Sequence, residues 1–353
     1  MKKTLVALAA LAATASFAQS SVTITGAIAT ALNSNSTKNG AGATVDTLGF
    51  FNNPTGTTSV IFTGVEDLGG GMKGLFLYEM DPNANYNNAV ALSGEIFVGV
   101  SGGFGSIKLG TPNMPTLSAS AGRNPFGTKT GGGYGGVQGP ALVRMPSSLR
   151  YDSPNFSGFS AVLAYAPEVA GAAAGATASN TAGTAVAANT GPVNTLAAGG
   201  AQTDIGLFYS NGPLAAALSL YNRGDTAAAS TPGATAGMRQ TNYNISYAFG
   251  TARVFFGGDT TDAIAVGGAS TNSTGNNLGL RYDAGNMTFL GNYAIRRNAA
   301  ANTDQRIWGL GFDYNFSKRT AAVVRMNNQT NDGAAAAAVA ETRNMMVGLI
   351  HKF

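Results

Sequence analysis

The chain has 353 residues, of which 11% are charged, 44% are apolar and 49 are glycine, and it contains no cysteine. The lack of cysteine excludes a disulfide framework and a thiolate metal site, and the lack of a long Lys/Arg run argues against a nucleic-acid-binding face. Two of the 21 basic residues, Lys2 and Lys3, lie in an N-terminal leader, so the rest of the chain is less basic than its formal charge of +4 suggests.

The first eighteen residues have the pattern of a secretory signal peptide. Lys2 and Lys3 precede a short apolar run, and the small residues Ser16 and Ala18 provide a cleavage site. We expect residues 1–18 to be removed and residues 19–353 to form the mature domain. After the leader no apolar run reaches the length of a transmembrane helix, so this chain could cross a membrane only with strands.

Apolar and polar side chains alternate from Val22 to Ile28, which is the period of a β-strand. The same alternation returns in 106–111 and in 147–153, where the charged side chains of Lys108 and Arg150 are confined to one face. Lipid outside a barrel and water inside it would impose this segregation. The alternation therefore predicts strands of a transmembrane barrel.

The connections between these strands alternate in length. Short turns rich in Gly, Asn and Asp are separated by long segments at 112–146, 167–202, 224–238, 259–275 and 328–341. Short turns at one rim and long loops at the other are typical of bacterial outer-membrane barrels. Segment 167–202 is nearly free of charge and low in complexity, which predicts an external loop. The sixteen predicted strands lie near 21–31, 57–66, 72–81, 93–101, 106–111, 147–153, 159–166, 203–210, 213–223, 239–249, 251–258, 276–283, 287–296, 306–314, 319–327 and 342–353.

Several segments are distinctive in order and spacing: Gln19–Thr23, Glu66–Gly71, Phe97–Gly105, Ser148–Pro154 and Gly348–Phe353. Together they resemble the trimeric porins of β-proteobacteria and Neisseria along nearly the whole mature chain. The resemblance implies an all-β fold, a transmembrane antiparallel barrel of about sixteen strands that forms a homotrimer in the Gram-negative outer membrane. It further implies passive diffusion of small hydrophilic solutes and ions, and a third long loop, about 112–146, folded into the pore.

The chain departs from the family at positions that matter for selectivity. Family members usually carry an arginine after the serine that matches Ser59, another near Gly94 and another at the position of Thr111, and this chain has none of the three. Arg144 and Arg150 do match positions where relatives have basic residues. The resemblance therefore implies a constriction of altered charge.

Basic residues outnumber acids around the predicted pore loop. Between Ser106 and Asp152 there are five basic residues and one acid, and Glu95 precedes this stretch. The excess predicts a weak preference for anions. The alternative for Arg123 and Lys129 is that they project from the loop into bulk water, whereas the others lie on or beside a wall strand. The candidate constriction residues are Lys108, Arg123, Lys129, Arg144, Arg150, Asp152 and Glu95.

The C-terminal strand carries the expected assembly signal. Val347, Leu349, His351 and Phe353 alternate onto one face, which we expect to point outward near an aromatic girdle, toward outer-membrane lipid. This terminal pattern resembles the signal that barrel-insertion machinery reads. His351 is the single histidine of the chain, and we expect an interfacial or assembly role for it.

Other functions have weaker support in the sequence. Catalysis would need a base or a carboxylate pair, yet Glu79, Asp81, Glu95 and Asp152 have no spacing that marks one, and no cofactor or metal motif is present. A substrate-specific channel often lines its path with aromatic residues, and the loop 112–146 contributes two. A structural or adhesive surface barrel is the third alternative.

Overall fold

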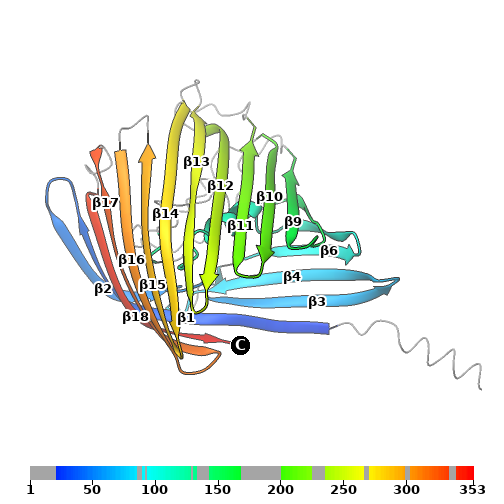
Figure 1. The fold of residues 1–353 in the computed structure, drawn as a ribbon, viewed down its shortest axis with the longest axis horizontal. Helices are drawn as coiled ribbons and strands as arrows, with labels where there is room; N and C mark the ends of the chain where they lie inside the picture. The colour runs from blue at the N-terminus through cyan, green and yellow to red at the C-terminus, as the bar shows by residue number, and fades with distance from the viewer. Residues whose placement is uncertain are drawn as a thin grey trace, which may run out of the picture.

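The computed structural model describes residues 21–85, 90–91, 94–128, 130–132, 143–167, 200–224, 235–265, 270–298, 303–333 and 339–353. The expected signal peptide lies outside these residues. Their strands form one antiparallel sheet that also encloses a short helix (Figure 1). No helix among them is long and apolar enough to cross a membrane. The elements are β1 (Ser21–Lys38), β2 (Thr44–Asn52), β3 (Ser59–Gly69), β4 (Met72–Pro82), β5 (Val90–Ala91), β6 (Ile96–Gly102), β7 (Gly105–Thr111), α2 (Pro115–Ala121), β8 (Ser148–Asp152), β9 (Phe159–Ala166), β10 (Gln202–Asn211), β11 (Leu214–Arg223), β12 (Thr235–Phe249), β13 (Ala252–Ala265), β14 (Ser270–Ala284), β15 (Met287–Asn298), β16 (Thr303–Asn315), β17 (Thr320–Asn331) and β18 (Glu341–Lys352).

The sheet closes on itself into a barrel. Each strand from β6 to β18 pairs with its neighbour in the chain, and β18 then pairs with β1, from Ala27 opposite Lys352 to Lys38 opposite Glu341. Figure 1 shows β18 lying beside β1, with the C-terminus next to them. Closure leaves the sheet without an unpaired edge, which a membrane requires because lipid cannot satisfy backbone polar groups.

The barrel has sixteen strand positions, as predicted. β2 and β3 together occupy one of them, because β2 pairs with the second half of β1 and β3 with its first half. β5 has two residues and pairs with the end of β4. Between β2 and β3 the hydroxyl of Thr58 replaces the backbone ladder: it accepts the N–H of Ala29 at 3.1 Å and donates to the carbonyl oxygen of Ala29 at 3.1 Å.

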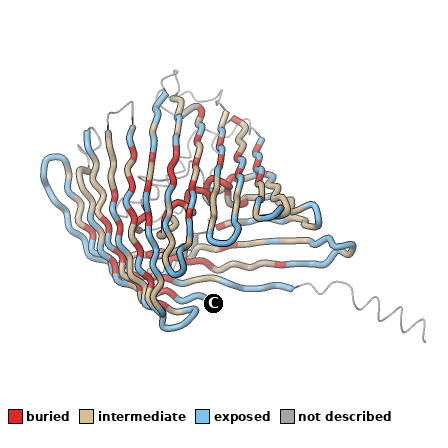
Figure 2. The backbone as a smooth tube through the Cα atoms, viewed as in Figure 1, coloured by how far each residue is buried: buried red, intermediate tan, exposed pale blue. Residues whose placement is uncertain are grey.

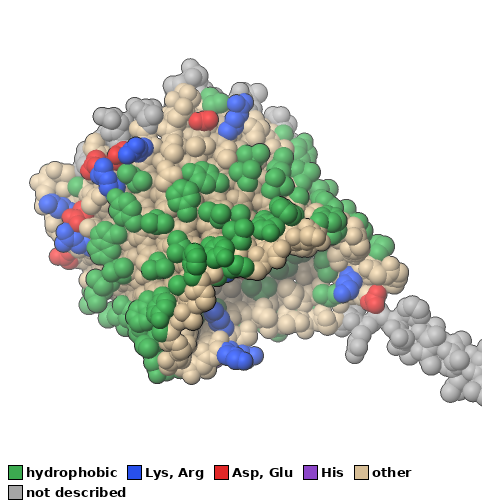
Figure 3. All heavy atoms as spheres, viewed as in Figure 1, with side chains coloured by type: hydrophobic (Ala, Val, Ile, Leu, Met, Phe, Trp, Pro, Cys, Tyr) green, Lys and Arg blue, Asp and Glu red, His purple; other side chains and the backbone are tan. Residues whose placement is uncertain are grey.

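The two faces of the wall differ as a membrane barrel requires. Leu278, Leu280 and Tyr282 of β14 point outward and are about half exposed, whereas Asn277, which precedes Leu278 and lies on the opposite face, is buried inside the barrel. Figure 2 shows buried and exposed positions alternating along the strands. In Figure 3 the apolar side chains cover the middle of the visible outer wall and the charged ones gather toward its ends. The outer surface therefore carries a lipid-facing band.

Several long loops predicted from the sequence are shorter than expected. β13 and β14 extend through most of 259–275, and β17 and β18 shorten the loop predicted at 328–341. Segment 44–52, which is not among the predicted strands, is β2. The extensions of β13, β14 and β17 carry mostly Thr, Asn, Asp and Ser on both faces, so the alternation that marks a lipid-facing strand is missing from them although the backbone ladder continues.

Candidate functional site

The third long loop folds into the barrel, as predicted. After β7 ends at Thr111, the chain forms the helix α2 with Pro115 in its first turn, where proline needs no hydrogen-bond partner for its nitrogen. α2 packs against β10, β11 and β12. Met114, Thr116 and Ala119 are completely buried. The described part of this loop, residues 112–128, 130–132 and 143–147, is called the pore loop below.

Polar side chains of the wall hold the first part of the pore loop. Thr116 donates from its backbone N–H and from its hydroxyl to the carboxylate of Asp204, both at 2.9 Å. Ser120 bonds to Asn242 at 3.1 Å. Asn244 donates to the carbonyl oxygen of Ala119 at 2.7 Å. These contacts tie α2 to β10 and β12.

An ionic cluster holds the next turn of the pore loop. Arg123 and Asp259 are both fully buried, and Arg123 Nη1 lies 2.7 Å from Asp259 Oδ1. The other oxygen of Asp259 lies 2.6 Å from Arg296 Nη2, and Arg296 also donates to Ser273 at 2.6 Å. Burial lowers the pKa of the Arg123 guanidinium and the nearby Asp259 carboxylate opposes this shift, so the group stays charged.

Small residues let the pore loop approach the wall at its far end. A Cβ atom on Gly309 would lie 2.2 Å from the carbonyl oxygen of Gly131, and one on Gly311 would lie 2.8 Å from the ring of Phe126. The guanidinium of Arg325 sits 5.7 Å from the centre of the Phe126 ring. The pore loop therefore lies along the wall from β10 to β17.

Three of the predicted constriction residues come together on β7 and β8. Lys108 Nζ lies 3.0 Å from one oxygen of Asp152, and Arg150 Nη2 lies 2.5 Å from the other. Arg150 also donates to the carbonyl oxygen of Asn113 at the start of the pore loop. The ammonium of Lys108 lies 5.0 Å above the ring of Phe97. Two cations thus share one carboxylate, and all three side chains keep partial exposure.

A second group of charges lies beside them. Arg144 Nη2 is 3.3 Å from the carboxylate of Glu79, which also accepts the backbone N–H of Glu95 at 2.8 Å. The carboxylate of Glu95 accepts two hydrogen bonds from Asn113, at 3.0 and 3.1 Å. Arg144 is therefore balanced by an acid that sequence reasoning did not include in the constriction.

The structure corrects the prediction for Arg123 and leaves Lys129 open. Arg123 was expected to contribute charge to the constriction, but its buried side chain anchors the loop to the wall instead. Lys129 lies outside the described residues. Glu79 and Asp259 were missed because each meets its partner across a wide sequence separation. An isolated acid at an inward-facing position of a strand is the signal that could have found Asp259.

The last residue is built into the barrel closure. Phe353 donates its N–H to the carbonyl oxygen of Gly26 and accepts the N–H of Gly26, both at 3.1 Å. A Cβ on Gly26 would lie 2.8 Å from the Phe353 ring, so the glycine makes room for the aromatic side chain. Val347 and Leu349 are more than half exposed on the outer face. His351 is exposed, with Nδ1 2.9 Å from the hydroxyl of Thr320.

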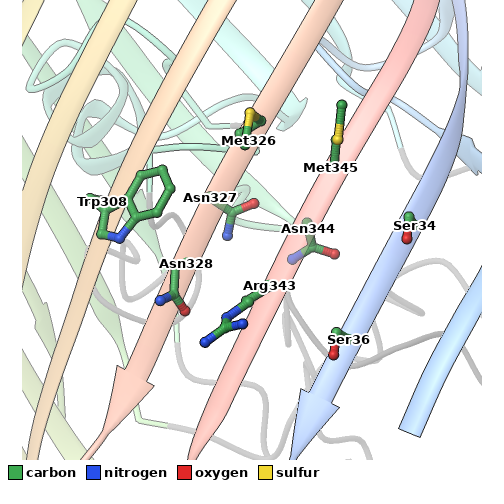
Figure 4. Close-up of a pocket in the computed structure, with 9 residues that line it drawn as sticks. All are labelled: Ser34, Ser36, Trp308, Met326, Asn327, Asn328, Arg343, Asn344 and Met345. Carbon is green, nitrogen blue, oxygen red and sulfur yellow. The ribbon is translucent and has the colours of Figure 1, made fainter.

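A cavity of about 230 Å³ lies at β16, β17, β18 and β1. Figure 4 shows its lining, in which Trp308, Met326 and Met345 are partly exposed side chains of the outer wall and Arg343 lies beside Asn328. Among the described residues no group of three His, Cys, Asp or Glu side chains could hold a metal ion.

The chain is similar to a known protein family, to named relatives and to solved structures. The family model described as Gram-negative porin matches residues 4–334. Outer membrane porin protein 32 of Delftia acidovorans is 30% identical over 336 residues, covering 91% of this chain and 87% of the relative. Major outer membrane protein P.IB of Neisseria lactamica is 27% identical over 309 residues, covering 83% of this chain and 82% of the relative. The solved anion-selective porin from Comamonas acidovorans has a TM-score of 0.76 at 24% identity, covering 95% of this chain and all of that one. This chain therefore belongs to the Gram-negative porin family, whose members form outer-membrane channels for the diffusion of small solutes.

Proposed function

We propose that this porin is a weakly anion-selective channel for small hydrophilic solutes. The observation that carries the proposal is the cluster in which Lys108 and Arg150 share the single carboxylate of Asp152, with all three side chains partly exposed. The cluster has one net positive charge beside the pore loop. A chloride ion passing it is attracted and a potassium ion is repelled.

The neighbouring charges limit the preference. Arg144 is balanced by Glu79, and Glu95 contributes a negative charge that is held by Asn113. Arg123 contributes nothing directly to the passage, because its buried guanidinium is paired with Asp259. Few net charges at the constriction support a weak preference rather than a strong one. The solved relative from Comamonas acidovorans is named an anion-selective porin, which is the same preference as the one proposed here.

The proposal favours a general channel over a substrate-specific one. Of the two aromatic residues in the segment 112–146, Phe126 is buried between the loop and the wall, and Tyr134 lies outside the described residues. An aromatic track along the passage therefore has no support in the part of the loop that the structure describes. Because the matched family and relatives are porins, we also infer that the chain is not an enzyme.

We further propose that the channel is a homotrimer exported with removal of residues 1–18. The trimer rests on the fold, which is shared with OmpT of Vibrio cholerae in a trimer form at a TM-score of 0.63 and 13% identity. The export signal rests on the sequence pattern of the leader.

The test of selectivity is the zero-current potential of the purified protein in a planar bilayer across a tenfold gradient of potassium chloride. We expect a potential with the sign of chloride preference and a permeability ratio of about two to four for chloride over potassium. A clear cation preference would refute the proposal.

A further inference from the structure

Two buried carboxylates of the wall hold the pore loop, and they differ in what they bind. Asp204 accepts hydrogen bonds from the neutral groups of Thr116. Asp259 instead binds two guanidinium groups, one from Arg123 of the loop and one from Arg296 of the wall. Asp259 thus joins the loop to the barrel through a charge that water does not reach.

We propose that Asp259 is the positioning residue of the constriction: by binding Arg123 and Arg296 at once, it keeps the pore loop against the wall and the open channel at one steady conductance. Removing one partner of a buried ion pair is strongly unfavourable, because the remaining charge is left buried without compensation. Without Asp259 the fully buried guanidinium of Arg123 loses its carboxylate. A movement of the loop away from the wall would let the guanidinium regain hydration.

The packing around Arg123 sets the direction of that movement. Its side chain lies directly over Gly257, where a Cβ atom would be 2.6 Å from Cγ of Arg123. The carbonyl oxygen of Arg123 is held by Asn277 of the next strand. The wall side of the arginine is therefore filled, and a released loop moves into the passage and narrows it.

Because Asp259 is shared by two guanidinium groups, its loss should disturb the pore loop more than the loss of Arg123 does. If Arg123 is removed, Asp259 keeps its contact with Arg296, so the wall retains a balanced pair and the loop loses one tether among several. If Asp259 is neutralised, two guanidinium groups lose their carboxylate at the same time. D259N should therefore disturb the loop more than R123M does. In the variant R123M/D259M the second change should add less than D259N does alone, since no buried guanidinium remains on the loop.

The experiment records single channels in planar bilayers at 1 M potassium chloride, where screening suppresses the effect of the selectivity charges. We expect D259N to raise the fraction of time spent at reduced conductance by at least about tenfold, and R123M to raise it by about threefold. The matched control is D283N, which neutralises the partner of Arg281 in a half-exposed pair on the neighbouring strand β14. D283N should leave the recordings unchanged. Heat-modifiable mobility on gels shows that each variant is folded.

An engineered cross-link between the loop and the wall tests whether Asp259 acts by positioning the loop or only by stabilising the protein. Ser120 and Asn242 are hydrogen-bonded across α2 and β12, and the chain has no other cysteine to interfere. Oxidised S120C/N242C should restore the steady conductance in the D259N and R123M backgrounds, and reduction should abolish the rescue. If D259N does not fold, the same rescue test is made in R123M, with the cross-link oxidised and reduced. The proposal would be overturned if folded D259N, or R123M in its place, conducts as steadily as the wild type. This result would count against the proposal whether or not the anion preference holds.

Discussion

The charges around Asp152 allow a test in which two substitutions of adjacent groups act in opposite directions. R150Q removes one positive charge from the cluster and D152N removes its single negative charge, while Lys108 stays in place. R150Q should therefore weaken the anion preference and D152N should strengthen it. The double variant R150Q/D152N should return close to the wild type, because its net charge is the same.

The size of the effect follows from Coulomb's law. A unit charge about 7 Å from a permeating ion contributes about 0.6 kcal/mol in water, and a Debye length of about 10 Å at 0.1 M salt reduces this to about 0.3 kcal/mol. Because chloride and potassium respond with opposite signs, each charge changes their permeability ratio about threefold. At 1 M salt the Debye length falls to about 3 Å and the change shrinks to about 1.2-fold.

The assay is the zero-current potential in a potassium chloride gradient, measured at low and at high mean salt for the four proteins. Both single variants lose the ion pair between Arg150 and Asp152, so opposite shifts identify charge as the cause. Shifts of the same sign in R150Q and D152N, or no shift in either, would show that this cluster does not face the permeating ions.

Three further predictions concern the barrel and its loops. Deleting Phe353 should prevent correct insertion, because its paired hydrogen bonds to Gly26 complete the closure; heat-modifiable protein at normal levels in outer membranes would contradict this. Deleting residues 172–196 should leave a folded, conducting barrel, because β9 and β10 already pair up to Ala166 and Gln202; loss of the folded band on gels would contradict it. G309V should displace the pore loop and change the conductance, because a side chain there meets the carbonyl oxygen of Gly131. The control G291A, whose added Cβ meets its nearest neighbour at 4.0 Å, should conduct as the wild type does.

The lipid-facing part of the barrel was predictable because lipid requires an apolar side chain at every second residue of a strand. Segments such as 276–283 and 287–296 were expected as strands and lie within β14 and β15. This pattern ends where polar residues occupy both faces of a strand, and for this reason the part of β13 beyond Gly258 was not predicted. The pore loop was found through resemblance to porins and not through any periodicity of its own.

The candidate site was predictable only where its residues lie on neighbouring strands. Lys108 and Arg150 were expected to face the lumen from the wall, and they lie directly opposite each other on β7 and β8. Glu79 and Asp259 could not be assigned, because the partner of each is set by the path of the loop across the barrel. Arg123 shows why counting charges along the sequence is not sufficient. Its partner Asp259 lies 136 residues away in the chain, and this contact keeps the Arg123 side chain out of the passage.

The most direct test of the account is the conductance of the purified protein in planar bilayers over a series of potassium chloride concentrations. A general diffusion channel should give stepwise increases in current whose size rises nearly in proportion to the salt concentration. The steps should also be insensitive to millimolar amounts of unrelated small sugars and amino acids. No steps, or steps that saturate and are blocked by one class of solute, would contradict the assignment as a general diffusion porin.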